Sequence, residues 1–211
     1  MKFKTFLFDL DGTLSDPLLG ISRSINHALI SLGYESHSEF ELAKYIGPPL
    51  DQTFKLLTSA SDNEVHALVA AYRERYRDVG FSENSLYPGI VEVLEKMSQQ
   101  GAFLGLCTSK RADFAEKILR MFNLRGHFSF VSGGDIGISK KQQIAQLRKD
   151  GVIDTNALMI GDRAVDIVAA HENGLGSVGV LWGYGSRAEL VDQQPLYLIE
   201  QVQQLGNLTD L

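Results

Sequence analysis

Phe6-Leu7-Phe8-Asp9-Leu10-Asp11-Gly12-Thr13 is the stretch that decides the fold of this 211-residue chain. The run from Phe6 to Leu10 is short, apolar and aromatic and ends at Gly12, as is typical of a buried β-strand. Asp9 and Asp11 are two residues apart, so both side chains can point the same way where the strand runs out. Ligands bind at this carboxyl edge in open α/β sheets. An isolated Asp-Gly-Thr turn is the simpler alternative.

Similar short apolar runs recur along the chain, with helical patterns between them. The runs cover residues 102–107, 127–131, 157–160 and 177–181. One helical pattern, for example, carries Ile90, Leu94 and Met97 and ends at Gly101. Strands that alternate with helices predict a parallel sheet with helices on both faces. We therefore expect a doubly wound, Rossmann-like α/β core.

The segment after the first strand breaks this alternation. Consecutive amphipathic helical patterns occupy residues 18–32, 39–46, 50–57 and 64–76, and Ser38 and Asp62 are candidate caps for two of them. No convincing strand interrupts these patterns. The sequence therefore predicts an α/β core from residues 1–15 and 86–211, with a helical domain over residues 16–85 inserted after the first strand.

Composition disfavours several classes of protein. The net charge of -6 and the pI near 5.4 argue against a nucleic-acid partner, because such binding depends on Lys and Arg. The single cysteine, Cys107, rules out an intramolecular disulfide and fits a reducing cytoplasm. The N-terminal apolar run is too short for a signal peptide, and no other stretch is apolar enough to cross a bilayer. We expect a cytoplasmic protein without a membrane partner.

A second acidic cluster, Gly161-Asp162-Arg163-Ala164-Val165-Asp166, follows the apolar run at 157–160. If a helix starts near Arg163, then Asp162 and Asp166 lie about one turn apart and can face the same point. Carboxylates gathered at one sheet edge repel each other unless a cation lies between them, and oxygen ligands suit Mg²⁺. The alternative for Asp162 is a simple helix cap.

Two further polar segments are candidates for phosphate contacts. Thr108-Ser109-Lys110 closes the strand that ends at Cys107 and precedes a helical pattern. A hydroxyl beside helix N-terminal amides suits an anion, although a simple cap is the alternative. Lys140 and Lys141 begin another helix, where lysines are usually solvated. Either lysine serves the site only if it reaches the cleft.

In this order, the four segments resemble the motifs of the haloacid dehalogenase superfamily, specifically its phosphatases of the phosphoglycolate phosphatase type. The resemblance covers nearly the whole chain, and the helical insertion resembles the cap of these enzymes. It implies that Asp9 is the nucleophile and that Asp11 acts as general acid and then general base. It also implies that Thr108 and Lys140 grip the phosphoryl oxygens. The implied metal residues are Asp9, the backbone carbonyl of Asp11 and Asp162 as Mg²⁺ ligands, with Asp166 in support, mainly by orienting the ligands.

The same resemblance implies the substrate contacts. Thr13 and Ser109 are expected beside the phosphate, and Lys44 and Arg23 are candidate anion contacts in the cap. The segment Trp182-Gly183-Tyr184-Gly185 is similar to a loop near the site in this family. The chain departs from the common pattern in two places: no proline follows Lys140, which leaves Lys141 as an alternative, and Ser109 replaces a frequent Asn.

The resulting hypothesis is a Mg²⁺-dependent phosphomonoester hydrolase that forms an aspartyl-phosphate on Asp9. Its partner is a small phosphate ester, such as phosphoglycolate, a nucleoside monophosphate or a phosphosugar. A phosphosugar mutase of the same superfamily is the nearest alternative, followed by a dehalogenase and by a binding module without turnover. The sequence does not predict the oligomeric state.

Overall fold

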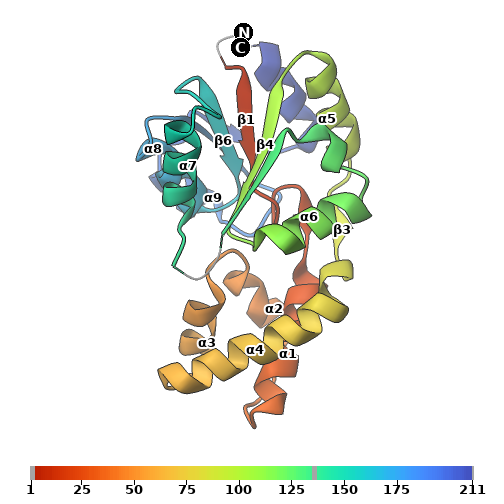
Figure 1. The fold of residues 1–211 in the computed structure, drawn as a ribbon, viewed down its shortest axis with the longest axis vertical. Helices are drawn as coiled ribbons and strands as arrows, with labels where there is room; N and C mark the ends of the chain where they lie inside the picture. Colours follow the sequence, from red (N-terminus) through yellow and green to blue (C-terminus); the bar gives the residue numbers. More distant parts are fainter. Residues whose placement is uncertain (1–2, 135–136, 211) are drawn as a thin grey trace. The chain divides into compact units, whose positions relative to one another are not determined.

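The computed structural model describes residues 3–134 and 137–210, and the chain divides into two compact units (Figure 1). One unit comprises Met1–Asp16 with Leu86–Leu211, and the other is Pro17–Ser85. Two short strands at the junctions between the units, β2 (Ser15–Asp16) and β3 (Ser85–Leu86), pair with each other. Within the described residues, no helix is long and apolar enough to span a membrane.

The first unit is built on a six-stranded parallel sheet. Its order is β5-β4-β1-β6-β7-β8, with β1 (Thr5–Phe8) inside it between β4 and β6. The other strands are β4 (Phe103–Thr108), β5 (Phe130–Gly133), β6 (Ala157–Gly161), β7 (Gly176–Val180) and β8 (Tyr197–Ile199). The five predicted strands and the doubly wound α/β fold are confirmed. Strand β8 was not predicted, because a three-residue strand carries too little pattern.

Helices cover both faces of this sheet (Figure 1). The core helices and 3₁₀ turns are α5 (Ile90–Gln99), α6 (Ala112–Met121), η3 (Arg125–His127), α7 (Lys140–Lys149), α8 (Ala164–His171), α9 (Arg187–Asp192) and η4 (Val202–Asp210). On one face, Ile144 from α7 and Ala169 from α8 join Leu7 of β1 in a buried apolar cluster. Burial of both sheet faces explains why the strands read as continuous apolar runs.

The second unit is helical. It contains α1 (Leu18–Ser31), α2 (Glu39–Leu42), η1 (Ala43–Tyr45), α3 (Leu50–Thr58), α4 (Asp62–Asp78) and η2 (Gly80–Ser82). Ser38 caps α2 as predicted. The predicted cap of α4 is wrong by one residue, because Ser61 forms a reciprocal capping box with Glu64 while Asp62 pairs with Lys55 at 2.7 Å.

The register of the central strands aligns their carboxyl ends. Phe8 is opposite Leu106 of β4 and Ile160 of β6, so the residues after Phe8 and Ile160 emerge at the same edge. The backbone N–H of Asp9 continues the ladder by donating to the carbonyl of Ile160 at 2.9 Å. Asp9 is therefore held at the sheet edge beside the chain that leads to Asp162.

Candidate active site

Three buried carboxylates meet at the carboxyl edge of the sheet. One oxygen atom from each of Asp9, Asp162 and Asp166 lies within 4.8 Å of the other two. Asp9 follows β1, Asp162 follows β6, and Asp166 lies in the first turn of α8. The structure thus brings together the two acidic clusters, which are more than 150 residues apart in the sequence.

Asp162 is not the cap of α8, which was the alternative role for this residue. Arg163 is the residue at the cap position, and its N–H donates to Asp166 Oδ2 at 3.0 Å. The carboxylate of Asp162 instead accepts hydrogen bonds from the Thr13 hydroxyl at 3.2 Å and from the Tyr184 N–H at 2.8 Å. Thr13, predicted as a substrate contact, therefore holds a carboxylate.

Lys140 is the cation among these carboxylates. Its side chain is fully buried, with Nζ 3.0 Å from Asp9 Oδ1 and in an ion pair with Asp166. A capping box between Ser139 and Gln142 starts α7 at Lys140 and so orients this side chain. Lys141, the alternative, has an exposed side chain that pairs with Glu172 at 3.1 Å.

The cluster carries an excess of negative charge. Burial raises the pKa of Asp162 to about 8, and the charges of Asp166 and Asp9 add to the effect. Burial lowers the pKa of Lys140, but the carboxylates of Asp166 and Asp9 outweigh burial and raise it overall. One ammonium group faces three carboxyl groups, so the site favours an additional cation.

Two buried oxygen atoms lack ordinary partners. Asp9 Oδ1 lies close to Lys140, but among the described residues neither it nor Asp11 Oδ1 accepts a hydrogen bond of normal geometry. A buried acceptor without a donor is costly unless a ligand satisfies it. Oxygen atoms of this kind are the ligands that hard divalent cations prefer. The donor set therefore fits a divalent metal ion.

Asp11 is paired with Lys110, a lysine to which the sequence pattern assigned no role. Lys110 Nζ lies 2.7 Å from Asp11 Oδ2, and the two side chains are only 7% and 12% exposed. Burial raises the pKa of Asp11, whereas Lys110 opposes that rise. From the sequence, only the position of Lys110 just after a buried strand could have indicated this contact. Many surface lysines occupy a similar position.

Thr108 lies buried at the end of β4, where a glutamine from α7 holds its backbone. Gln143 Nε2 donates to the Thr108 carbonyl at 3.1 Å, and Gln143 Oε1 accepts from the Ser132 hydroxyl at 3.0 Å. Neither Thr108 nor Ser109 caps α6, since Arg111 occupies that position. Ser109 is exposed. Gln143 is a second residue that sequence reasoning missed.

The segment 182–185 closes over the acidic cluster from the side of β7. Trp182 Nε1 donates to the Thr13 carbonyl at 3.0 Å. A Cβ atom on Gly183 would lie 2.3 Å from the Gly12 carbonyl oxygen and 2.4 Å from Asp162 Cβ. Only a glycine fits at this distance, so the loop contacts the site with its backbone.

Comparison with known proteins decides the family. A family model described as haloacid dehalogenase-like hydrolase matches residues 6–180. The chain belongs to this family. The hydrolase is 37% identical over 201 residues to a 5'-nucleotidase of Pseudomonas aeruginosa, covering 93% of this chain and 91% of that protein. It is 30% identical over 204 residues to the phosphoglycolate phosphatase of Aliivibrio fischeri, covering 91% and 90%.

Solved structures agree with this assignment. The crystal structure of a predicted phosphatase from Clostridium acetobutylicum matches the hydrolase with a TM-score of 0.93 at 31% identity, covering 99% of both chains. Together, the family and these relatives show that the hydrolase is a phosphatase that acts on a phosphate ester. Phosphatases of this family generally use a metal ion, in keeping with the buried acidic triad.

The remaining predicted contacts lie in the helical unit of the hydrolase. Arg23 Nη1 pairs with Glu83 at 2.8 Å, and Lys44 Nζ lies 5.0 Å from the centre of the Tyr45 ring. Both cations belong to Pro17–Ser85, whereas the carboxylates belong to the first unit. Their contact with substrate stays a prediction.

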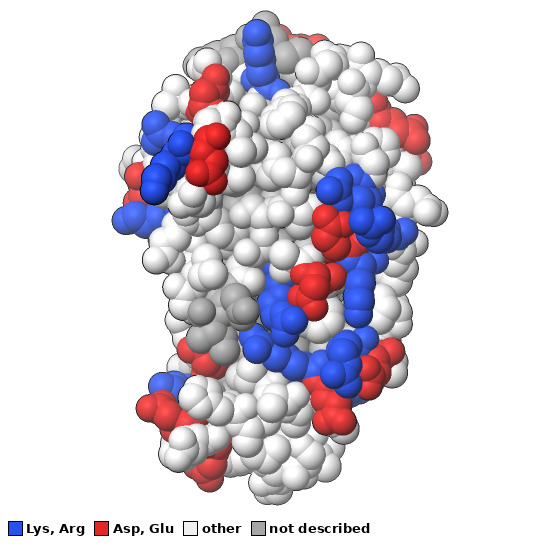
Figure 2. Space-filling view, viewed as in Figure 1, with Lys and Arg blue, Asp and Glu red and all other residues white. Residues whose placement is uncertain are grey.

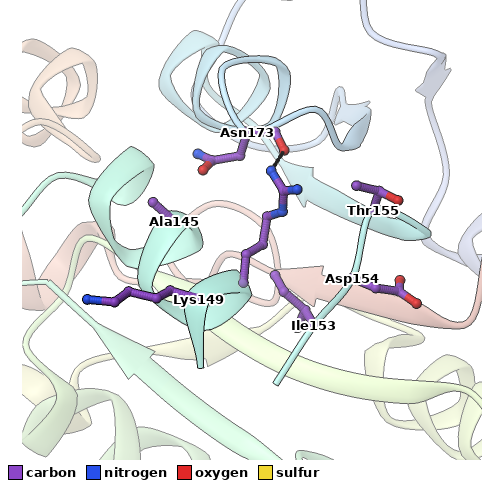
Figure 3. Close-up of a pocket in the computed structure, with 7 residues that line it drawn as sticks. Ala145, Lys149, Ile153, Asp154, Thr155 and Asn173 are labelled. Carbon is purple, nitrogen blue, oxygen red and sulfur yellow. Dashed lines mark hydrogen bonds between the residues drawn. The ribbon is translucent and has the colours of Figure 1, made fainter. Parts of the chain in front are cut away.

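A hollow of about 550 Å³ elsewhere on the hydrolase lies at the opposite edge of the sheet, before the start of β6 (Figure 3). Its labelled lining residues come from α7, from the segment before β6 and from the turn after α8. Arg148 donates to the Asn173 carbonyl, and Asp154 accepts from the Asn156 N–H at 2.8 Å. Arg148 and Asp154 thus each have a hydrogen-bond partner within the core unit.

Basic side chains of the hydrolase gather over α6 on the face shown in Figure 2, interleaved with acidic ones. Arg111 pairs with Asp113 at 3.0 Å, and Arg125 pairs with Glu116 at 2.9 Å. Exposed pairs of this kind contribute about 1 kcal/mol or less. This patch therefore differs from the acidic cluster, in which the charges are buried.

Proposed function

We propose that the hydrolase is a Mg²⁺-dependent phosphomonoesterase that removes phosphate from a small metabolite through an aspartyl-phosphate on Asp9. The observation that carries the proposal is the buried cluster of Asp9, Asp162 and Asp166 around Lys140. Its excess negative charge and the Asp9 oxygen, which among the described residues accepts no hydrogen bond of normal geometry, suit a site that receives a cation together with a phosphate ester.

The residues that would hold Mg²⁺ are Asp9, Asp162 and the backbone carbonyl of Asp11, with Asp166 in support. When bound, the ion supplies positive charge that offsets the repulsion between a carboxylate and a phosphate dianion. The Thr13 hydroxyl and the Tyr184 N–H orient Asp162 from behind, as partners of metal ligands commonly do.

Asp9 and Asp11 would carry the two chemical steps. In the first, an oxygen of Asp9 forms a bond to phosphorus while the bond to the leaving oxygen breaks and Asp11 donates a proton to that oxygen. In the second, Asp11 takes a proton from a water molecule whose oxygen attacks phosphorus. The Asp9–phosphorus bond breaks, inorganic phosphate leaves, and both carboxyl groups return to their starting states.

Thr108 and Lys140 would bind the phosphoryl oxygens during both steps. Phosphoryl transfer is accelerated chiefly by donors held in place around the group, because its several charged oxygens need stabilisation in the transition state. Lys140 is well suited to this task, since the packed start of α7 fixes its ammonium group before substrate arrives. The exposed Ser109 hydroxyl is a further candidate contact.

Substrate choice would depend on the helical unit, with Lys44 and Arg23 as anion contacts. The named relatives act on phosphate esters of different size, a 5'-nucleotidase on one hand and a phosphoglycolate phosphatase on the other. We propose a small soluble ester of this range, a nucleoside monophosphate, phosphoglycolate or a phosphosugar. The single buried cysteine, Cys107, is consistent with a cytoplasmic location.

The test is release of inorganic phosphate from a panel of such esters, with Mg²⁺ and with EDTA. We expect phosphate release that requires Mg²⁺ and disappears in Asp9→Asn, whereas Asp113→Asn, an exposed control next to Arg111, stays active. Borohydride reduction of enzyme quenched during turnover should convert Asp9 to homoserine, which peptide mass spectrometry detects. Isomerised product without phosphate would indicate a mutase, and chloride release from a haloacid alone would indicate a dehalogenase.

A further inference from the structure

Lys110, to which the family resemblance assigned no role, forms an ion pair with Asp11. Lys110 Nζ lies 2.7 Å from Asp11 Oδ2, and both side chains are nearly excluded from solvent. Ion pairs at the surface are held loosely, but a pair that is buried on both sides has few alternative rotamers. The pair therefore fixes one oxygen of Asp11 in a single position.

The backbone of Lys110 is anchored as well. Its N–H donates to Thr108 Oγ1 at 3.2 Å, and its carbonyl accepts from the Gly134 N–H at 2.9 Å. These contacts link Lys110 to the ends of β4 and β5. The ammonium group thus projects from a braced turn, so its position is set by the sheet rather than by a mobile loop.

The second oxygen of Asp11 is left available. Asp11 Oδ1 is buried and, among the described residues, accepts no hydrogen bond. Since Lys110 occupies Oδ2, the carboxyl group cannot rotate without losing its ion pair. Oδ1 is consequently the oxygen that stays free to meet a leaving group or a water molecule.

We propose that Lys110 is a positioning residue, which orients Asp11 so that Oδ1 serves in proton transfer. This inference rests on the proposed function, because it requires Asp11 to be the general acid. Lys110 acts on the reaction through Asp11, whereas Lys140 belongs to the separate group formed with Asp9 and Asp166. The ammonium group also offsets the charge that Asp11 carries after it has given up its proton.

The first measurement compares kcat/KM for an alkyl phosphate and for 4-nitrophenyl phosphate. An alkoxide is a poor leaving group that needs a proton, whereas nitrophenolate leaves without one. We expect Lys110→Met to lower kcat/KM for the alkyl ester at least ~10-fold more than for the aryl ester, since general acid catalysis contributes about 10²- to 10⁴-fold. Lys110→Arg should recover part of the loss, and the control Lys117→Met, an exposed lysine on α6, should change neither value.

The second measurement is a double-mutant cycle with Asp11→Asn. If Lys110 acts through Asp11, the double variant loses no more kcat/KM for the alkyl ester than Asp11→Asn alone. Equal losses for both esters, or additive losses in the cycle, would overturn the assignment, as would a rise in KM alone. If Asp11→Asn itself shows no difference between the esters, the proposed role of Asp11 fails instead. Thermal melts confirm that each variant is folded, and Lys110→Gln replaces Lys110→Met if the latter is not.

Discussion

Lys140 Nζ lies 3.0 Å from Asp9 Oδ1, on a side chain with no exposed surface. Burial of an ammonium group without partners is unfavourable, so the carboxylates around Lys140 are what make its buried position possible. The next residue, Lys141, reaches solvent and pairs with Glu172. This contrast makes the two lysines a matched pair for experiment.

We expect Lys140→Met to lower kcat about 10²- to 10³-fold, the usual effect of removing a donor from a site that stabilises transition-state charge. The free energy of unfolding should also fall by about 3–5 kcal/mol, since the variant leaves buried carboxylates without their cation. Steady-state kinetics and denaturant unfolding measure both effects. Lys141→Met should match the wild type, and an inactive Lys141→Met with an active Lys140→Met would reverse the assignment.

Addition of Mg²⁺ to metal-free protein should raise its thermal stability. A ligand at 100 times its Kd stabilises the folded state by about 2.7 kcal/mol, and scanning calorimetry detects such a change. Asp162→Asn should abolish most of the increase, because Asp162 belongs to the triad. Asp192→Asn, at the exposed end of α9, is the control. An unchanged increase in Asp162→Asn would remove this residue from the metal site.

Gln143 should contribute to both stability and turnover. Gln143→Leu removes the donor to the Thr108 carbonyl and leaves the Ser132 hydroxyl without its acceptor. Buried polar groups without partners cost about 1–3 kcal/mol each. We also expect a lower kcat, because the Thr108 backbone loses the hydrogen bond that holds it in position. Gln146→Leu, at an exposed position on the same helix, is the control. Equal melting temperatures for the two variants would contradict the prediction.

Gly183→Ala tests the close approach of the loop to Asp162. The added methyl group would meet the Gly12 carbonyl and Asp162 Cβ, so the loop must shift. Overpacking of this kind costs about 1–3 kcal/mol. Displacement of Asp162 should also weaken Mg²⁺ binding, which titration calorimetry measures. Gly126→Ala, with open space around it, should behave like the wild type.

Glu83 makes the helical unit sensitive to acid. The hydrogen bond from Arg75 holds the pKa of Glu83 below its usual value, burial opposes this effect, and Arg23 adds to it. A lowered pKa means that the stabilisation is present above the unfolded value of about 4.3 and is lost as pH falls through the folded value. Melting temperatures of wild type and Glu83→Gln should therefore differ at neutral pH and converge as the pH falls below the folded pKa of Glu83. A constant difference would exclude this ion pair as the cause.

The apolar strands predicted the sheet, and the positions of the acidic residues predicted that Asp9, Asp162 and Asp166 come together at one edge of it. Periodicity is a local property, so the runs at 102–107 and 157–160 identified β4 and β6 directly from the sequence. Local patterns were weaker at element ends. Ser61 rather than Asp62 caps α4, because the Glu64 side chain forms a capping box with Ser61, whereas Lys55 forms an ion pair with Asp62.

The sequence by itself determined that carboxylates follow two buried strands and that such strands belong in a parallel sheet. Only the tertiary structure decided which side chains meet there. Two such contacts between separate elements join Lys110 to Asp11 and Gln143 to Thr108. Their physical origin is strand register and helix packing, which set distances between residues that no local pattern relates.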